Sequence, residues 1–173
     1  MATSAVRPEK SEYAPYYERY ISRVPDGDVV AELNKQLEET LALIRSIPET
    51  RGNYRYAEGK WSIKELLGHV IDSERVFAYR ALRFGRGDST PLSGFEQDDF
   101  MRGANFNKRS FEDLAKEYEY VRRASISLFA SLEDDAWARR GTANNDEVSV
   151  RGLAFIIAGH ERHHIEVLRT RYL

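Results

Sequence analysis

Apolar residues recur every three or four positions in four long segments of the chain, and this spacing lines one face of an α-helix. The segments are residues 30–47, 63–85, 111–132 and 153–168. Ser62 and Ser110 stand where a helix N-cap is expected, and Pro48 follows the first segment, where it would stop a helix. Helices of about 20 residues are about 30 Å long and must bury their apolar faces against one another. The sequence therefore predicts an all-α fold, a four-helix bundle.

Composition narrows the classes of protein to which the chain can belong. It has 173 residues, enough for about one domain. Its 26 basic and 28 acidic residues leave a net charge of −2, which argues against nucleic acid as the main partner. Cysteine is absent, which excludes disulfides, thiolate metal sites and a cysteine nucleophile. No apolar run is long enough to span a membrane and no secretory signal precedes the first helix, so we expect a cytoplasmic protein without a membrane partner.

The chain divides into an N-terminal arm with a short helix, residues 1–27, and a bundle domain, residues 28–173. Residues 1–12 are expected to form a loose polar arm. Four tyrosines, interrupted by Pro15, then favour a short helix that lies across the body of the protein, since tyrosine suits a boundary position. They are Tyr13, Tyr16, Tyr17 and Tyr20. Residues 143–146 are expected as a polar turn, and no segment shows the alternation of paired strands.

The connection between the second and third predicted helices, residues 85–107, is long for a compact domain. It carries three phenylalanines and is too apolar to float free of the body. Two interpretations stay open: a packed lid over one end of the bundle, and a crossover connection.

Histidines are the most informative residues of the sequence, at positions 69, 160, 163 and 164. His160 and His164 are four positions apart, so they are neighbours on the apolar face of the last predicted helix. Imidazoles in a protein core need partners for their ring nitrogens. A metal ion is one such partner, and tyrosine or carboxylate neighbours are the alternative. His69 lies at the edge of the apolar face of the second helix, where it either faces solvent or becomes a third ligand.

Three further residues are candidates for contacting these histidines. His163 lies off the apolar face, and we expect it at a helix boundary as a hydrogen-bond partner, with a role as ligand left open. Glu74 falls within an apolar face, where a carboxylate needs a partner such as a ligand histidine or a buried arginine. Glu161 is expected to be solvated or to bridge helices, with catalytic base as the other interpretation. We assign no residue a catalytic role from the sequence.

Two glycines stand directly before candidate ligands. Gly68 precedes His69, and Gly159 precedes His160. Glycine inside a helix costs about 1 kcal/mol against alanine, so both positions predict the close approach of a neighbouring helix.

Residues 160–164 also match the HExxH pattern in which zinc proteases hold their metal. Those enzymes take a third ligand downstream, and no histidine follows His164 in this chain. The strands that usually accompany such a site are not predicted either. We therefore discount a metalloprotease.

Two motifs resemble the signatures of the DinB-like superfamily. Residues 60–69, KWSIKELLGH, with DSER at 72–75, are similar to the first, and residues 159–165, GHERHHI, are similar to the second. The resemblance covers residues 28–172. It implies a four-helix bundle, often dimeric, with a long crossover loop between the second and third helices. Carried over by position, it also implies a metal site formed by His69, His160 and His164.

The resemblance implies a metal-dependent activity, because characterised members include thiol transferases that use bacillithiol, mycothiol or glutathione, and a maleylpyruvate isomerase. Three neutral imidazoles leave coordination positions open, as in catalytic metal sites. Nickel, zinc, manganese or iron would suit such ligands. Because the chain has no cysteine, a reacting thiol must come from a cosubstrate.

Two functional hypotheses follow. The first is an enzyme, a metal-dependent thiol transferase or hydrolase, that activates a thiol cosubstrate or water for reaction with a small-molecule substrate. Its pocket would be roofed by residues 85–107 and the N-terminal tyrosines. The second is a non-catalytic metal-binding or dimerising module of a stress response. A homodimer is the expected assembly.

Overall fold

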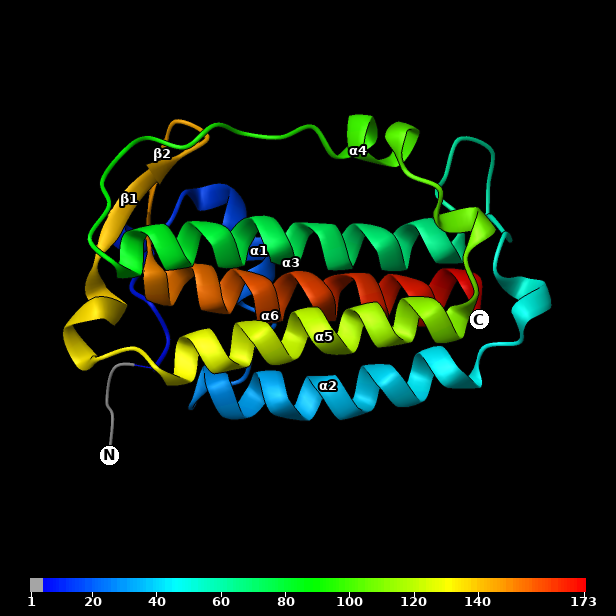
Figure 1. The fold of residues 1–173 in the computed structure, drawn as a ribbon, viewed down its shortest axis with the longest axis horizontal. Coiled ribbons are helices and arrows are strands. Elements are labelled where there is room, and N and C mark those ends of the chain that lie inside the picture. Colours follow the sequence, from blue (N-terminus) through cyan, green and yellow to red (C-terminus); the bar gives the residue numbers. More distant parts are fainter. Residues whose placement is uncertain (1–4) are drawn as a thin grey trace.

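Four long helices within residues 5–173, the part of the chain that the computed structural model describes, pack side by side as a bundle (Figure 1). They are α2 (Val29–Ser46), α3 (Ile63–Gly85), α5 (Phe111–Ala130) and α6 (Val150–Val167). Helices α2 and α6 run in one direction along the bundle, and α3 and α5 run in the other. Neighbours around the bundle follow the order α2, α5, α3, α6. The predicted four-helix bundle is confirmed.

The ends of the long helices follow local signals in the sequence. A side-chain oxygen caps the first turn of each one, at Asp28, Ser62, Ser110 and Ser149. At α3 the cap is reciprocal, because the carboxylate of Glu65 also accepts a hydrogen bond from the backbone N–H of Ser62 at 2.7 Å. After α6 the chain continues through one π-helical turn, Leu168–Tyr172.

The core consists of two apolar clusters with a polar layer between them. One cluster lies toward the N-terminal arm and includes Leu33, Phe77 and Phe129. The other lies toward the opposite end of the bundle and includes Leu37 and Leu114. Buried polar residues separate the two clusters on all four helices, and they are Gln36, Glu74, Arg122 and Glu161.

The connection from α3 to α5 runs along the side of α3 for the length of the bundle (Figure 1). It contains the short helix α4 (Gln97–Gly103) and a 3-10 turn, Phe106–Lys108. Of the two interpretations left open by the sequence, the crossover connection is therefore correct, and residues 85–107 do not cap one end. The long return is the reason that α3 and α5 are parallel.

A short antiparallel hairpin corrects the expectation that the chain has no strands. It consists of β1 (Arg140–Ala143) and β2 (Asp146–Ser149). Asn144 and Asn145 form its turn with φ values of 54° and 68°, which suit a two-residue hairpin turn. The predicted polar turn is present, but strands of four residues are too short to show alternation in the sequence. The crossover pairs with the hairpin at Leu92, whose N–H donates to the carbonyl of Thr142 at 2.9 Å.

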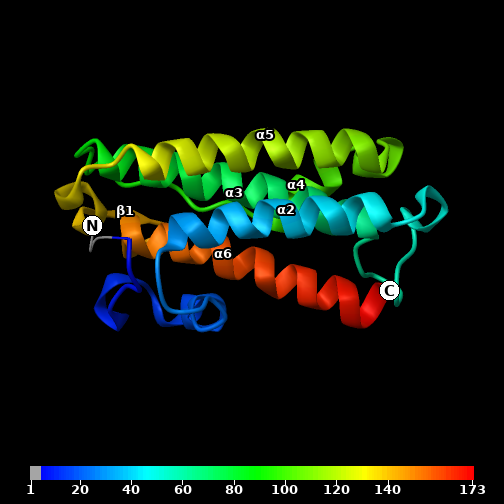
Figure 2. The ribbon, with the colours of Figure 1, turned by 90° about the horizontal axis from the view of Figure 1, so that it is seen from below.

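The N-terminal arm packs against the bundle and is not loose over residues 5–12; residues 1–4 lie outside the described range. Glu12 is 2% exposed, and its carboxylate accepts a hydrogen bond from Arg151 of α6 at 2.9 Å. The arm contains two 3-10 turns, Lys10–Glu12 and Pro15–Tyr17, before helix α1 (Glu18–Ile21). Figure 2 shows this segment against one flank of the bundle, where α1 packs on α6. Among residues 5–173, no helix has the length and apolar character needed to cross a membrane.

The two glycines that precede candidate ligands both allow close approach. A Cβ at Gly159 would lie 2.0 Å from the backbone oxygen of Tyr20, so helix α1 rests directly on the backbone of α6. A Cβ at Gly68 would lie 2.4 Å from the ring of Phe106, which belongs to the crossover. The approaching group at Gly68 is therefore a side chain, whereas at Gly159 it is a helix.

Gly159→Ala is expected to lower the free energy of unfolding by about 1–3 kcal/mol, because the Tyr20 backbone cannot move aside without displacing α1. Gly103→Ala is the control, since a Cβ at that position meets no atom within 4 Å. We expect it to change stability by less than about 0.5 kcal/mol. Urea unfolding of both variants measures the difference, and equal stabilities would contradict the packing of α1 on Gly159.

Candidate metal centre

Three histidines meet where α3 packs against α6. Nε2 of His160 lies 3.0 Å from Nε2 of His69 and 3.1 Å from Nε2 of His164. One ring nitrogen from each residue falls within 4.8 Å of the others, so the three could hold one metal ion together. His160 and His164 stand one turn apart on α6, and His69 faces them from α3. The structure thus brings together the three residues that the family resemblance implies as ligands.

Aromatic side chains pack around this histidine cluster. The ring centroid of Trp61 lies 4.6 Å from that of His69, and the ring of Tyr20 lies 5.2 Å from that of His160. Phe77 contributes a third neighbour at 5.9 Å from His160. These contacts restrict rotation of the imidazoles.

Burial sets the charge of the cluster. His69 is 3% exposed, and desolvation lowers its pKa to about 4. Desolvation also lowers the pKa of His160 and His164 well below the usual value, with a further contribution from the neighbouring histidines. All three imidazoles are therefore neutral at pH 7. If Nδ1 of His69 carries the proton and donates to Ser73 Oγ at 3.4 Å, Nε2 keeps its lone pair.

Hydrogen bonds alone satisfy this cluster only in part. Nε2 of His160 carries either one lone pair or one proton, yet two other Nε2 atoms converge on it. A cation that receives a lone pair from each ring satisfies all three atoms at once. Neutral imidazole nitrogens suit zinc, nickel, iron and manganese, so the residues present fit a divalent transition metal.

His163 lies outside the group of three. Its half-buried ring lies 5.0 Å from the ring of His164 and 5.6 Å from that of Tyr20. The one candidate metal-binding group found among residues 5–173 does not include it.

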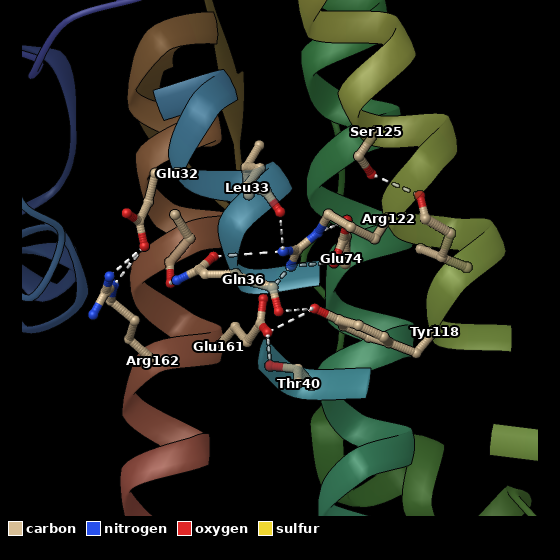
Figure 3. A network of polar contacts seen from close by, with 12 residues as sticks. Glu32, Leu33, Gln36, Thr40, Glu74, Tyr118, Arg122, Ser125, Glu161 and Arg162 are labelled. Carbon is tan, nitrogen blue, oxygen red and sulfur yellow. Dashed lines mark hydrogen bonds and ion pairs between the residues drawn. The ribbon is translucent and has the colours of Figure 1, made fainter. Parts of the chain in front are cut away.

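Glu74 and Glu161 belong to a buried network around Arg122 (Figure 3). Arg122 is 0% exposed and donates to both carboxylate oxygens of Glu74, at 2.9 and 2.8 Å. It also donates to Glu161. The carboxylate of Glu161 further accepts hydrogen bonds from Tyr118 at 2.7 Å and from Thr40 at 2.5 Å. These bonds join the four long helices, and within the described residues none of them reaches a ligand histidine.

Sequence reasoning did not single out Arg122, although one signal was available. Glu74 lies in an apolar face, and a carboxylate there requires a cation on a neighbouring helix. Arg122 is one turn after Tyr118 on the third predicted helix, which places it on the apolar face that begins at Phe111.

Two clefts reach the histidine cluster. The first has a volume of about 300 Å³ and includes His69 and His160 among its lining residues. Tyrosines of the N-terminal arm and residues 94–97 of the crossover form its walls, as expected from the sequence. The second has a volume of about 390 Å³ and is lined by His164, Trp61 and their neighbours. Small molecules could therefore approach the cluster from two directions.

Taken together, the fold and this site define a helical-bundle protein with a three-histidine cluster between two of its helices. The sequence matches the model of the DinB superfamily over residues 32–168, and the chain belongs to this superfamily.

Individual proteins resemble the chain in sequence or in fold. A protein of Oceanobacillus iheyensis, provisionally named a metal-dependent hydrolase, is 24% identical over 152 residues, which cover 83% of this chain and 87% of the relative. The structure of YfiT from Bacillus subtilis, described as "a probable metal-dependent hydrolase with an unusual four-helix bundle topology", matches with a TM-score of 0.69 at 14% identity, over 96% of both chains. A mycothiol-dependent maleylpyruvate isomerase matches with a TM-score of 0.67 at 12% identity. The latter match covers 88% of this chain but 62% of the isomerase.

Arg122→Met is expected to lower the free energy of unfolding by about 3–5 kcal/mol, because it leaves two buried carboxylates without their cation. Arg123→Met is the control, since that neighbouring side chain is 57% exposed and should contribute less than about 1 kcal/mol. Adding Glu74→Gln and Glu161→Gln to the Arg122 variant should recover part of the loss. Urea unfolding measures the stability of all these variants. Equal losses of stability in Arg122→Met and Arg123→Met would contradict the role of Arg122 in the network.

Proposed function

We propose that the chain is a metal-dependent enzyme that activates water or a thiol cosubstrate for hydrolysis or group transfer on a small molecule. The observation that carries this proposal is the convergence of three neutral Nε2 atoms, two of them on buried residues, beside two open clefts. When bound, a divalent ion lowers the pKa of a water or thiol that it holds, which supplies a nucleophile near neutral pH.

The residues of the chain prepare this site in separate ways. His69, His160 and His164 would hold the ion and leave positions free, as three-ligand catalytic sites do. Ser73 orients the ring of His69 through Nδ1. Both oxygens of the Glu161 carboxylate are occupied by hydrogen bonds, which argues against this residue as a catalytic base.

Which nucleophile the site uses, water or a thiol, depends on whether the cleft admits a thiol cosubstrate. The names of the Oceanobacillus protein and of YfiT support hydrolysis, and the name of the isomerase supports a thiol. A thiol must come from outside the chain, which has no cysteine. A volume of about 300 Å³ lies at the lower end of the range for small-molecule sites, which begins at about 300 Å³.

His164→Ala is expected to abolish stable metal binding, because it removes one of three ligands. His163→Ala is the matched control, since its ring lies outside the cluster, and it should retain the metal content of the parent. Elemental analysis of untagged protein, after reconstitution with nickel, zinc, manganese or iron, measures both. Circular dichroism checks that each variant is folded. Full retention of metal by His164→Ala, or no metal in the parent, would refute the proposed centre.

A second candidate, a dimerising module without turnover, has one specific observation in its favour. Tyr79, Leu82 and Tyr120 are 49%, 39% and 70% exposed on adjoining faces of α3 and α5. They line an apolar groove of about 480 Å³. Exposed apolar surface of this kind is typical of sites where proteins associate.

If this groove is the interface of a homodimer, Tyr120→Glu should shift the mass in light scattering from dimer to monomer. Tyr54→Glu is the control, because Tyr54 is also exposed but lies outside the groove. A dimer that survives Tyr120→Glu would place the interface elsewhere.

A further inference from the structure

Arg80 and Arg122 are the two arginines among residues 5–173 that have almost no exposed surface, at 3% and 0%. They differ in their partners. Arg122 is neutralised by two carboxylates. Arg80 takes part in no ion pair within the described residues, and its guanidinium donates instead to the backbone oxygen of Ser93 at 3.0 Å. A buried cation is costly without an anion, so Arg80 lacks the partner that Arg122 has.

The surroundings of Arg80 are aromatic. Its guanidinium lies 5.9 Å from the ring centroids of both Phe77 and Phe95 and also interacts with the hydroxyl of Tyr17. A guanidinium carries five N–H donors, of which one serves Ser93 and another serves Tyr17. Donors remain for an oxyanion, which guanidinium groups commonly bind with two parallel hydrogen bonds.

Arg80 lines the same cleft as the metal centre. His69, Ser73, Phe77 and Arg80 succeed one another at four, four and three positions along α3, so they share one face of the helix, and all four line the 300 Å³ cleft. The Cα atoms of His69 and Arg80 are about 16 Å apart along the helix axis. The ring of Phe77 lies 5.9 Å from the Arg80 guanidinium and 5.9 Å from the ring of His160, so it stands between the two groups.

We propose that Arg80 binds an oxyanion, a carboxylate or a phosphate, at the end of the substrate or cosubstrate that points away from the metal centre. This inference rests on the proposed function, because it assumes that the reacting group lies at the histidines. The middle of the ligand would lie against Tyr17, Phe77 and Phe95. The cleft therefore selects an elongated small molecule with an apolar or aromatic middle and one anionic end.

Two carboxylates also line this cleft, and they do not replace the missing partner. Glu96 and Asp146 are both exposed, and neither forms an ion pair with Arg80 among the described residues. Water screens such exposed charges, whereas a group buried beside the guanidinium would interact with it much more strongly.

Nor is Arg80 needed to hold the crossover in place. The crossover is bound to the hairpin by two backbone hydrogen bonds, from the N–H of Leu92 to Thr142 at 2.9 Å and from the N–H of Asn144 to Leu92 at 3.0 Å. These bonds fix the segment immediately before Ser93. The guanidinium donors that line the cleft are therefore available to a ligand.

The test measures binding of small probes to the full chain by isothermal titration calorimetry. Phenylacetate and phenyl phosphate carry the two oxyanions, and phenylacetamide is the neutral match. We expect at least one oxyanion to bind the parent ten times or more tightly than phenylacetamide, and the tighter of the two identifies the head group. Arg80→Met should reduce oxyanion binding to the level of the amide. Arg102→Met, on an exposed arginine of the crossover, should bind as the parent does.

Each measurement is made on metal-loaded and metal-free protein, which separates this inference from the proposed function. Binding that depends on Arg80 in both forms supports the oxyanion site, even if the metal content refutes the metal centre. Oxyanion binding that survives Arg80→Met, that requires only the metal, or that equals amide binding would overturn the inference. If Arg80→Met fails to fold, Arg80→Lys decides, because it keeps the charge but loses the paired donors. Arg80→Lys should weaken binding of the oxyanion and leave binding of the amide unchanged.

Discussion

The ion pairs of Arg122 with Glu74 and Glu161 are the interactions on which the rest of the structure depends. Arg122 lies on α5, whereas the two carboxylates lie on α3 and α6, the helices that supply the histidines. Because the three charged groups must meet without water, α3 and α6 cannot slide past each other without leaving a buried charge unpaired. The network thus fixes the register of the two helices that carry the histidine cluster, although it contacts none of the three histidines. Glu161 and His160 are consecutive, so one turn of α6 carries both a buried ion-paired carboxylate and a histidine of the cluster.

Much of this fold can be predicted from the sequence, since the helices follow local rules. The spacing of apolar residues and the caps at Ser62 and Ser110 locate the long helices to within a few residues. Features that depend on distant partners could not be predicted in this way. Glu12 is buried because Arg151 pairs with it from the far end of the chain, and nothing in the sequence around Glu12 indicates that contact.

The same division holds for the candidate site. His160 and His164 could be paired from their spacing alone, because one helix carries both. His69 lies at the edge of an apolar face, and periodicity does not define the rotation of α3 closely enough to turn its ring toward α6. Only the family resemblance placed it with the other two. The sequence could not single out Arg80. What distinguishes this arginine is that it is buried without a carboxylate partner, and no sequence pattern indicates that.

The crossover is bound to the body at Leu92 on the hairpin and at Phe106 over Gly68, and between them Ser93 accepts a hydrogen bond from Arg80 and Met101 packs in the core. Between these points it forms one wall of the cleft, while the histidines and Arg80 stand on α3 and α6. The histidine cluster and the outer wall of the cleft therefore belong to different segments of the chain. Substitutions at the exposed positions 96–100 can reshape the space offered to a ligand without disturbing helix register. A bundle built in this way can keep its histidine cluster and offer a differently shaped cleft by changing a single connection.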